Sequence, residues 1–262
     1  MNHAGVIYVA EGPDYTELAC QSLRSLRQLH PDLPAHLFTD QPAPSASFDA
    51  IHPIPTGCNR AKIAGMIASP FERTLFLDCD TLVVGPVCEG FTFLDRFDLA
   101  IAHDVRRSSA LIEEAENAPA DFPQHNSGVM FFNKSPAMTR FLRDWAAAYD
   151  AAAHARDQVT LKDLLWESDL RFWVLPPEWN LRRVTMLDAW EPLDAIPRII
   201  HSHQLLRHLR NDDMQVHDLP AILELEREAL QAEWEALRQR LDVAELGDPV
   251  TRFRRARNLR WE

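Results

Sequence analysis

Short apolar runs alternate with amphipathic segments along most of the chain. Runs of four to six apolar residues predict buried strands, and apolar residues three or four positions apart predict helices packed on a sheet. Strands are expected at residues 5–10, 35–40, 49–55, 73–84, 98–104, 124–133, 170–175 and 198–201. Helices are expected at residues 15–29, 59–66 and 136–153, and from residue 156 onwards. The alternation predicts an α/β fold with a mostly parallel central sheet and flanking helices.

The last part of the chain follows a different pattern. Between residues 219 and 246, apolar residues recur from Leu223 to Leu241 at roughly coiled-coil spacing amid Glu and Arg, which predicts an amphipathic helix. Residues 251–262 then carry five arginines among apolar and aromatic residues. We therefore expect a main domain at 1–218 and a C-terminal helical extension with a basic tail at 219–262. The tail suits either an anionic membrane surface or the acidic body of the protein itself.

Composition excludes several functional classes. With 262 residues, 46% of them hydrophobic, the chain can bury a sizeable core. Its net charge of −12 argues against nucleic-acid binding, and an anionic ligand would need a metal or local basic side chains. The four cysteines match neither a Cys-x-x-Cys pair nor a zinc spacing. Without a signal-like start or a membrane-length apolar run, we expect a cytoplasmic protein, peripheral to the inner membrane surface if the tail binds there. The oligomeric state stays open.

Two carboxylates interrupt the apolar run 73–84, at Asp78 and Asp80. In a strand, such positions share a face about 7 Å apart. Burying two uncompensated acids would cost several kcal/mol each, so a cation is expected beside them. Oxygen ligands favour a hard divalent metal. The alternative is a strand end whose acids cap the following turn.

Further polar stretches follow or open the other predicted elements. The loop after the first strand, in the run AEGPDYTELACQSL from Ala10, occupies the usual nucleotide position of an open α/β sheet. The Asn-Ser-Gly at 126–128 suits close backbone approach to a ligand at the mouth of a strand. Asp157 and Gln158 open a helix, where Asp157 also suits an N-cap. The strand 198–201 ends in His201.

Taken in this order, these stretches resemble the motifs of GT-A fold glycosyltransferases, especially family eight, the glycogenin-like and galactosyltransferase-like enzymes. The resemblance covers roughly residues 5 to 207. It rests on the opening loop, Asp78-Cys79-Asp80, Asn126-Ser127-Gly128, Asp157-Gln158, Trp179-Asn180 and His201. It implies transfer of a sugar from a nucleotide-sugar, a UDP-sugar by analogy, with retention of anomeric configuration. The acceptor is not specified: a glycan, a lipid-linked glycan and a protein all remain open.

The resemblance also implies roles for individual residues. The metal ligands would be Asp78, Asp80 and His201, and a nitrogen among oxygen ligands favours Mn²⁺ over Mg²⁺. The donor sugar would contact Asn126, Asp157 and Gln158. The nucleotide and diphosphate would contact Ala10, Tyr15, Lys62, Asp78, Asp80, Ser127, Gly128 and Arg207. One segment departs from the family pattern. Where the family has His-x-x-Gly-x-x-Lys, residues 201–207 of this chain are His-Ser-His-Gln-Leu-Leu-Arg, which lacks the glycine.

Two other functions fit parts of the sequence. The segment Leu77-Asp78-Cys79-Asp80-Thr81 is similar to the nucleophile loop of haloacid-dehalogenase-type phosphatases, but its threonine comes one residue too early. A non-catalytic protein that binds a sugar nucleotide, or a scaffold on the same fold, would also explain the missing glycine. Release of UDP from candidate donors separates these alternatives from a transferase.

Overall fold

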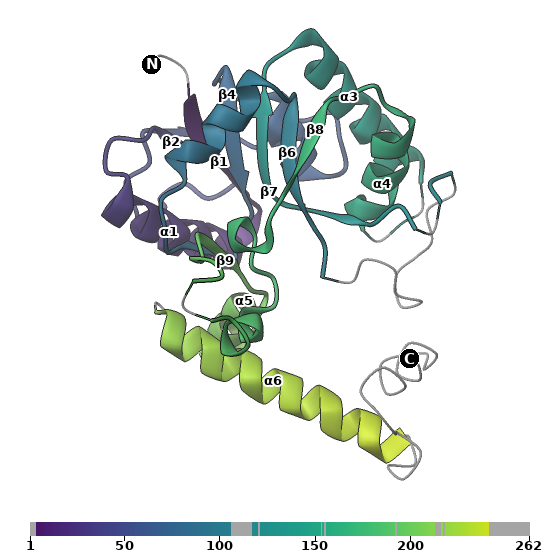
Figure 1. The fold of residues 1–262 in the computed structure, drawn as a ribbon. Helices are drawn as coiled ribbons and strands as arrows, with labels where there is room; N and C mark the ends of the chain where they lie inside the picture. Colours follow the sequence, from purple (N-terminus) through teal and green to yellow (C-terminus); the bar gives the residue numbers. More distant parts are fainter. Residues whose placement is uncertain are drawn as a thin grey trace.

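A seven-stranded sheet with the strand order β3-β2-β1-β4-β7-β6-β8 runs through the middle of the protein (Figure 1). The computed structural model describes residues 4–105, 117–119, 121–152, 154, 156–191, 193–212, 216 and 218–240. The strands are β1 (Ala4–Ala10), β2 (Ala35–Thr39), β3 (Ala50–His52), β4 (Arg73–Leu77), β6 (Leu99–His103), β7 (His125–Asn133) and β8 (Phe172–Leu175). Every neighbouring pair is parallel except those that include β7. The predicted mostly parallel sheet is confirmed.

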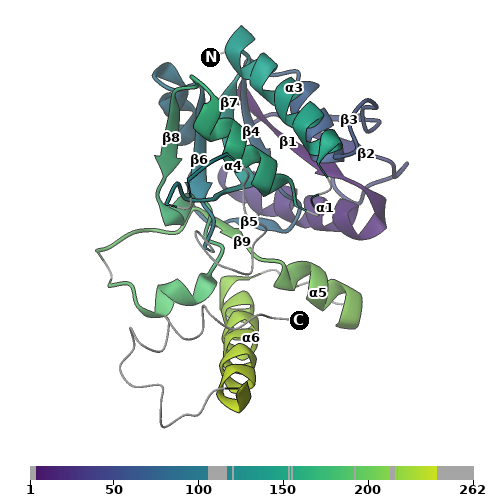
Figure 2. The same cartoon turned by 90° about the vertical axis from the view of Figure 1, so that its right-hand side faces the viewer.

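Helices cover both faces of this sheet, because successive side chains of its buried strands point to opposite sides. On one face, Val6 and Tyr8 of β1 belong to the same core as Leu18 of helix α1 (Gly12–Leu29). On the other face, Ile7 belongs to a second core with Trp145. The helices that contribute to this second core are α2 (Ala61–Ile67), α3 (Pro136–Ala151) and α4 (Asp157–Glu167). Figure 2 shows α3 and α4 together on the face away from α1.

The run 73–84 is not the single strand that its apolar pattern predicts. It forms β4 and then, after a bend at residues 78–80, the short strand β5 (Thr81–Val83). The hydroxyl of Thr81 donates to the backbone oxygen of Asp78 over 2.8 Å, which closes the bend. Because the acids lie in this bend, their carboxylates are partly exposed rather than buried within a strand.

Strand β5 pairs with β9 (Ile199–His201) in a separate antiparallel two-stranded sheet. Its register places Thr81 opposite His201, and the backbone amide of Ser202 donates to the oxygen of Asp80 over 3.0 Å. This small sheet brings His201 beside the acids, across more than a hundred residues of sequence.

Several helix boundaries differ from the predictions. Helix α1 begins at Gly12, three residues before the expected start, and this residue has a φ of 82° that favours glycine. Helix α4 begins at Asp157, and its N-cap is Arg156. Helix α5 (Gln204–Asp212) and the 3₁₀ segments η1 (Cys88–Asp95), η2 (Pro177–Trp179) and η3 (Val184–Asp188) were not anticipated.

The predicted C-terminal helix is α6 (Leu219–Arg240), which lies below α5 in Figure 1. The guanidinium of Arg227 pairs with Asp188 of η3, and the hydroxyl of Ser202 donates to the buried carboxylate of Glu226. The predicted continuation to residue 246 and the basic tail lie outside the described residues. No helix in the described part of the chain has the length and apolarity needed to cross a bilayer. The division at residue 218 stays a prediction.

Candidate metal and nucleotide site

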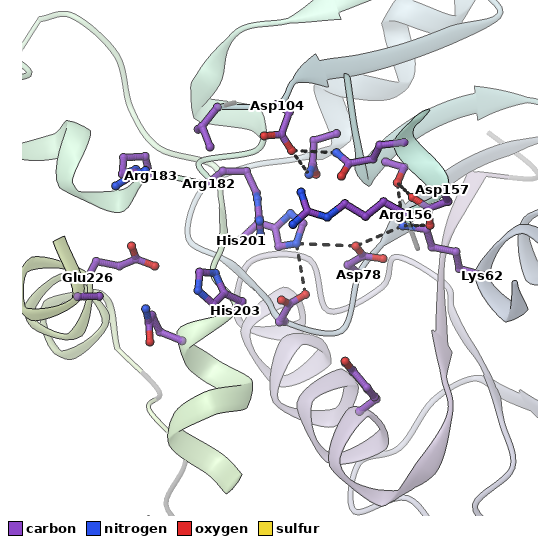
Figure 3. A pocket seen from close by; sticks show the side chains of 18 of the residues that line it. Lys62, Asp78, Asp104, Arg156, Asp157, Arg182, Arg183, His201, His203 and Glu226 are labelled. Atoms are coloured by element: carbon purple, nitrogen blue, oxygen red, sulfur yellow. Dashed lines mark hydrogen bonds and ion pairs between the residues drawn. The ribbon is translucent and has the colours of Figure 1, made fainter. Parts of the chain in front are cut away.

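Asp78, Asp80 and His201 converge at the edge of the sheet where β4 ends. One potential ligand atom from each side chain lies within 4.8 Å of the others. His201 Nε2 is 3.3 Å from Asp80 Oδ1 and 3.8 Å from Asp78 Oδ2 (Figure 3). Two carboxylate oxygens and an imidazole nitrogen form a donor set that fits Mn²⁺ or Mg²⁺. In the described residues this is the one such cluster of three.

The imidazole of His201 is held by a chain of buried side chains. His201 Nδ1 lies 2.9 Å from Asn180 Oδ1. The Asn180 amide donates to Asn126 Oδ1 over 2.9 Å, and the Asn126 amide donates to Asp104 Oδ2 over 3.0 Å. Asn126 Oδ1 also accepts from the backbone N–H of Gly128 over 3.0 Å.

The direction of every bond in this chain follows from its two ends. The carboxylate of Asp104 accepts and the backbone N–H of Gly128 donates, which fixes the orientation of both asparagine amides. Asn180 therefore presents its carbonyl oxygen to His201, so His201 carries its proton on Nδ1. The lone pair of Nε2 is then directed towards Asp78 and Asp80, which is the form that binds a metal.

Gly128 leaves space for the cluster itself. A Cβ atom at this position would lie 2.0 Å from His201 Cε1 and 2.8 Å from Asp78 Oδ2. Its backbone oxygen accepts from the N–H of Asp78 over 2.7 Å, which fixes the start of the bend. The glycine of the Asn-Ser-Gly stretch is therefore required by close packing against two candidate ligands.

A second charged group lies beside the cluster, centred on the buried carboxylate of Asp157. Asp157 Oδ2 is 3.1 Å from the ammonium of Lys62 and 2.7 Å from Nε of Arg60. Lys62 also donates to Ser127 Oγ over 2.8 Å and lies 3.6 Å from Asp78. Burial alone would raise the pKa of Asp157, but Lys62 and Arg60 lower it overall. The N-cap of α4 is Arg156, and Asp157 is the first residue of the helix, so its expected capping role is wrong.

Gln158 projects next to this group with a defined orientation. Its Nε2 donates to Asp104 Oδ2 over 2.8 Å and to the backbone oxygen of His125 over 3.0 Å. Both acceptors require an N–H, so the amide cannot be reversed without losing two bonds. The carbonyl oxygen of Gln158 is consequently available to a ligand in the adjoining cavity.

These groups line one cavity of about 540 Å³. It contains most of the residues singled out from the sequence, namely Tyr15, Lys62, Asp78, Asp80, Asn126, Ser127, Asp157, Gln158 and His201. Ala10, Gly128 and Arg207 are not among its lining residues: Ala10 is buried at the end of β1, and Arg207 is exposed on α5. Tyr15 is 38% exposed at the rim, with the guanidinium of Arg210 5.8 Å from its ring centroid.

Other lining residues were missed by the sequence reading. Three are arginines, Arg156, Arg182 and Arg183, and two are acids of α6, Glu226 and Glu233. Single arginines in loops carry no spacing signal, and the position of α6 over the cavity depends on tertiary packing. Asp104 ends a predicted strand at the same edge as Asp78, and this position was the available signal for it.

Comparison with known proteins bears on the fold. No protein-family model matches the sequence, and no curated protein matches it. Among solved structures, the glycosyltransferase GlyE of Streptococcus pneumoniae TIGR4 is similar over 84% of this chain, with 16% identity and a TM-score of 0.56. The chain spans 63% of GlyE, less than two thirds of its length.

The match to each of two further structures extends over nearly the full length of that structure's chain. The galactosyltransferase LgtC, in complex with donor and acceptor sugar analogs, matches 86% of this chain and 95% of its own, with 14% identity and a TM-score of 0.55. Mouse xyloside xylosyltransferase 1 matches 76% of this chain and 97% of its own, with 17% identity and a TM-score of 0.53. Similarity at this level of identity establishes architecture. The chain has the GT-A fold that these glycosyltransferases share.

Proposed function

We propose that this protein transfers a sugar from a nucleotide-sugar, a UDP-sugar, to an acceptor in a metal-dependent reaction that retains anomeric configuration. The observation that carries the proposal is the convergence of Asp78, Asp80 and His201 beside a polar cavity, at the sheet edge where open α/β folds bind nucleotides. The similarity to solved glycosyltransferases supports the same class of reaction.

Asp78, Asp80 and His201 would hold the metal, Mn²⁺ rather than Mg²⁺ because one ligand is nitrogen. When bound, a divalent ion supplies positive charge that neutralises the diphosphate leaving group. The chain's own residues then position the reactants. Tyr15 would stack on the base at the rim, and Lys62 and Ser127 would contact the donor near the metal ligands.

The donor sugar would lie against Asn126, Asp157 and Gln158. Asp157 holds Lys62 and Arg60 in place through ion pairs of 3.1 and 2.7 Å, so it fixes the positive side of the cavity. Gln158 would direct its carbonyl oxygen at the sugar, where positive charge develops at the anomeric carbon as the glycosidic bond weakens. Holding the donor in one orientation supplies much of the expected rate enhancement.

The decisive experiment is release of UDP from a panel of UDP-sugars by the purified protein with Mn²⁺, with and without candidate glycan acceptors. We expect turnover that requires the metal and is lost in Asp80→Asn. Metal-dependent binding of a UDP-sugar without release or transfer would favour the sugar-nucleotide-binding alternative. The phosphatase alternative has no support from the fold, and it predicts phosphate release from phosphomonoesters instead.

The location and partners are also proposed. A cytoplasmic protein would meet nucleotide-sugars directly, and the basic tail at residues 251–262 would bring it to an anionic inner membrane surface. Removing this tail should leave turnover of a water-soluble acceptor unchanged and reduce sedimentation with anionic liposomes at low salt.

A further inference from the structure

The diphosphate of the proposed donor needs more positive charge than the established contacts leave free. Lys62 and Arg60 both pair with Asp157, and Arg183 lies 3.6 Å from Glu233 of α6. Arg207, which the sequence resemblance puts forward, is exposed on α5 and outside the cavity lining. The cavity lining holds two further arginines, Arg156 and Arg182.

Arg182 lines the cavity, and Figure 3 shows it next to His201, on the side away from Lys62. Its Nε atom is buried and has no hydrogen-bond partner among the described residues. The described residues therefore give this donor no acceptor, which leaves the guanidinium at the cavity wall able to bind an anion. A guanidinium suits this task because its planar donors match two phosphate oxygens at once.

The local backbone explains why Arg182 lies there. The N–H of Leu181 donates to the oxygen of Ile199 over 2.9 Å, and the N–H of His201 donates to the oxygen of Leu181 over 3.2 Å. Residues 180–182 are thereby fixed beside β9. The N–H of Arg182 donates to the oxygen of Asn180 over 2.9 Å, which turns the chain tightly. The same short segment thus carries both the partner of His201 and the arginine.

We propose that Arg182 binds the donor diphosphate and stabilises it as it departs, the task that the sequence resemblance gives to Arg207. This inference rests on the proposed function of the same site. In the transfer, the bond between the anomeric carbon and the diphosphate oxygen breaks, and its electron pair stays on that oxygen. The acceptor oxygen bonds to the carbon and loses its proton to solvent. Arg182 then faces the additional negative charge on the nucleoside diphosphate.

The test compares Arg182→Met, Arg182→Lys and the matched variant Arg207→Met by calorimetry with UDP and with UMP, in Mn²⁺. Arg182→Met should weaken UDP binding about 10- to 100-fold, the loss expected for hydrogen bonds to a charged group, and weaken UMP binding less. Arg182→Lys should recover part of the loss, and Arg207→Met should bind UDP like the unmodified protein. Equal melting temperatures and equal Mn²⁺ affinities would show that the variants keep the fold and the cluster.

Two results would overturn the role assigned to Arg182 and leave the proposed function standing. One is unchanged UDP affinity in Arg182→Met, which would also result if Arg182 contacted the acceptor instead. The other is a loss in Arg207→Met that exceeds the loss in Arg182→Met. If the unmodified protein binds neither UDP nor another nucleoside diphosphate with Mn²⁺, the proposed function fails and this inference fails with it.

Discussion

Asn180 Oδ1 accepts the Nδ1 proton of His201 over 2.9 Å, and this contact leaves Nε2 unprotonated and directed at two carboxylates. Both residues are almost completely buried. A candidate ligand thus has its tautomer and ring orientation set by a neutral amide, which is itself oriented by Asn126. Outer contacts of this kind commonly decide how tightly a metal binds.

Asn180→Ala should weaken Mn²⁺ binding by about 10- to 100-fold, because the imidazole loses the acceptor that fixes its tautomer. Asn180→Asp keeps an acceptor for Nδ1 and should lose less. Calorimetric titration with Mn²⁺ in the absence of nucleotide measures the effect directly. Equal Mn²⁺ affinity in Asn180→Ala and the unmodified protein would show that Asn180 does not orient the ligand.

Gly128→Ala should abolish tight Mn²⁺ binding, because its Cβ would displace the His201 ring, 2.0 Å away. Gly90→Ala is the matched control, since a Cβ there would lie 2.3 Å from the ring of Phe131, in the core. We expect both variants to melt at lower temperature and only Gly128→Ala to lose metal affinity. Loss of Mn²⁺ affinity to the same extent in both would attribute the effect to general destabilisation.

Gln158→Ala should lower kcat with little change in donor KM if the carbonyl oxygen acts mainly in the transition state. Its Nε2 donates to Asp104, so the variant also removes one contact from a carboxylate that still binds Asn126. Steady-state kinetics with a UDP-sugar, together with a thermal melt, distinguish the two effects. A variant with normal kcat would remove Gln158 from the mechanism.

His125 gives a pH-dependent contribution to stability with a definite sign. Burial, followed by the charge of His103, lowers its pKa to about 4, and neither ring nitrogen has a hydrogen-bond partner. The unfolded chain therefore binds a proton below about pH 6.5 that the folded protein binds only near pH 4. Stability falls as pH drops through this window, by roughly 3 kcal/mol at most from this residue.

His125→Phe removes that titration, and Phe122 and Phe172 already surround the ring. The variant should lose less stability than the unmodified protein between pH 6.5 and pH 4, which denaturant unfolding at both pH values measures. A stability difference between the two proteins that stays constant across this range would rule out the effect of His125.

The alternation of apolar runs and amphipathic helices was enough to predict the layers of the fold, because buried strands and one-sided helices leave periodic signals. The same pattern failed at residues 73–84. Four apolar or small residues before the bend at Asp78-Cys79-Asp80 and five after it concealed the bend, which depends on pairing of β5 with a distant β9. Long-range pairing has no local signature.

The residues of the candidate site also fall into two groups, those with a local sequence signal and those placed by tertiary contacts. Asp78, Asp80, Asn126, Asp157 and Gln158 stand next to strand ends or helix starts, where topology alone brings polar residues to one edge. Arg182 lies in a loop after η2, and its position depends on the contacts of Leu181 with β9. Helix α6 adds Glu226 through packing on Ser202. The place of such residues in the site can be recognised only from the folded structure.

The central claim is that Asp78, Asp80 and His201 bind a metal that in turn binds a nucleoside diphosphate. Its most direct test is calorimetry of UDP binding to the unmodified protein and to Asp80→Asn, each with and without Mn²⁺. The substitution keeps the shape of the side chain, and a thermal melt of the metal-free protein checks that the fold is retained. We predict that UDP binds the unmodified protein tightly only with Mn²⁺, and that Asp80→Asn loses this dependence together with the affinity. Normal Mn²⁺-dependent UDP binding by Asp80→Asn would contradict the claim.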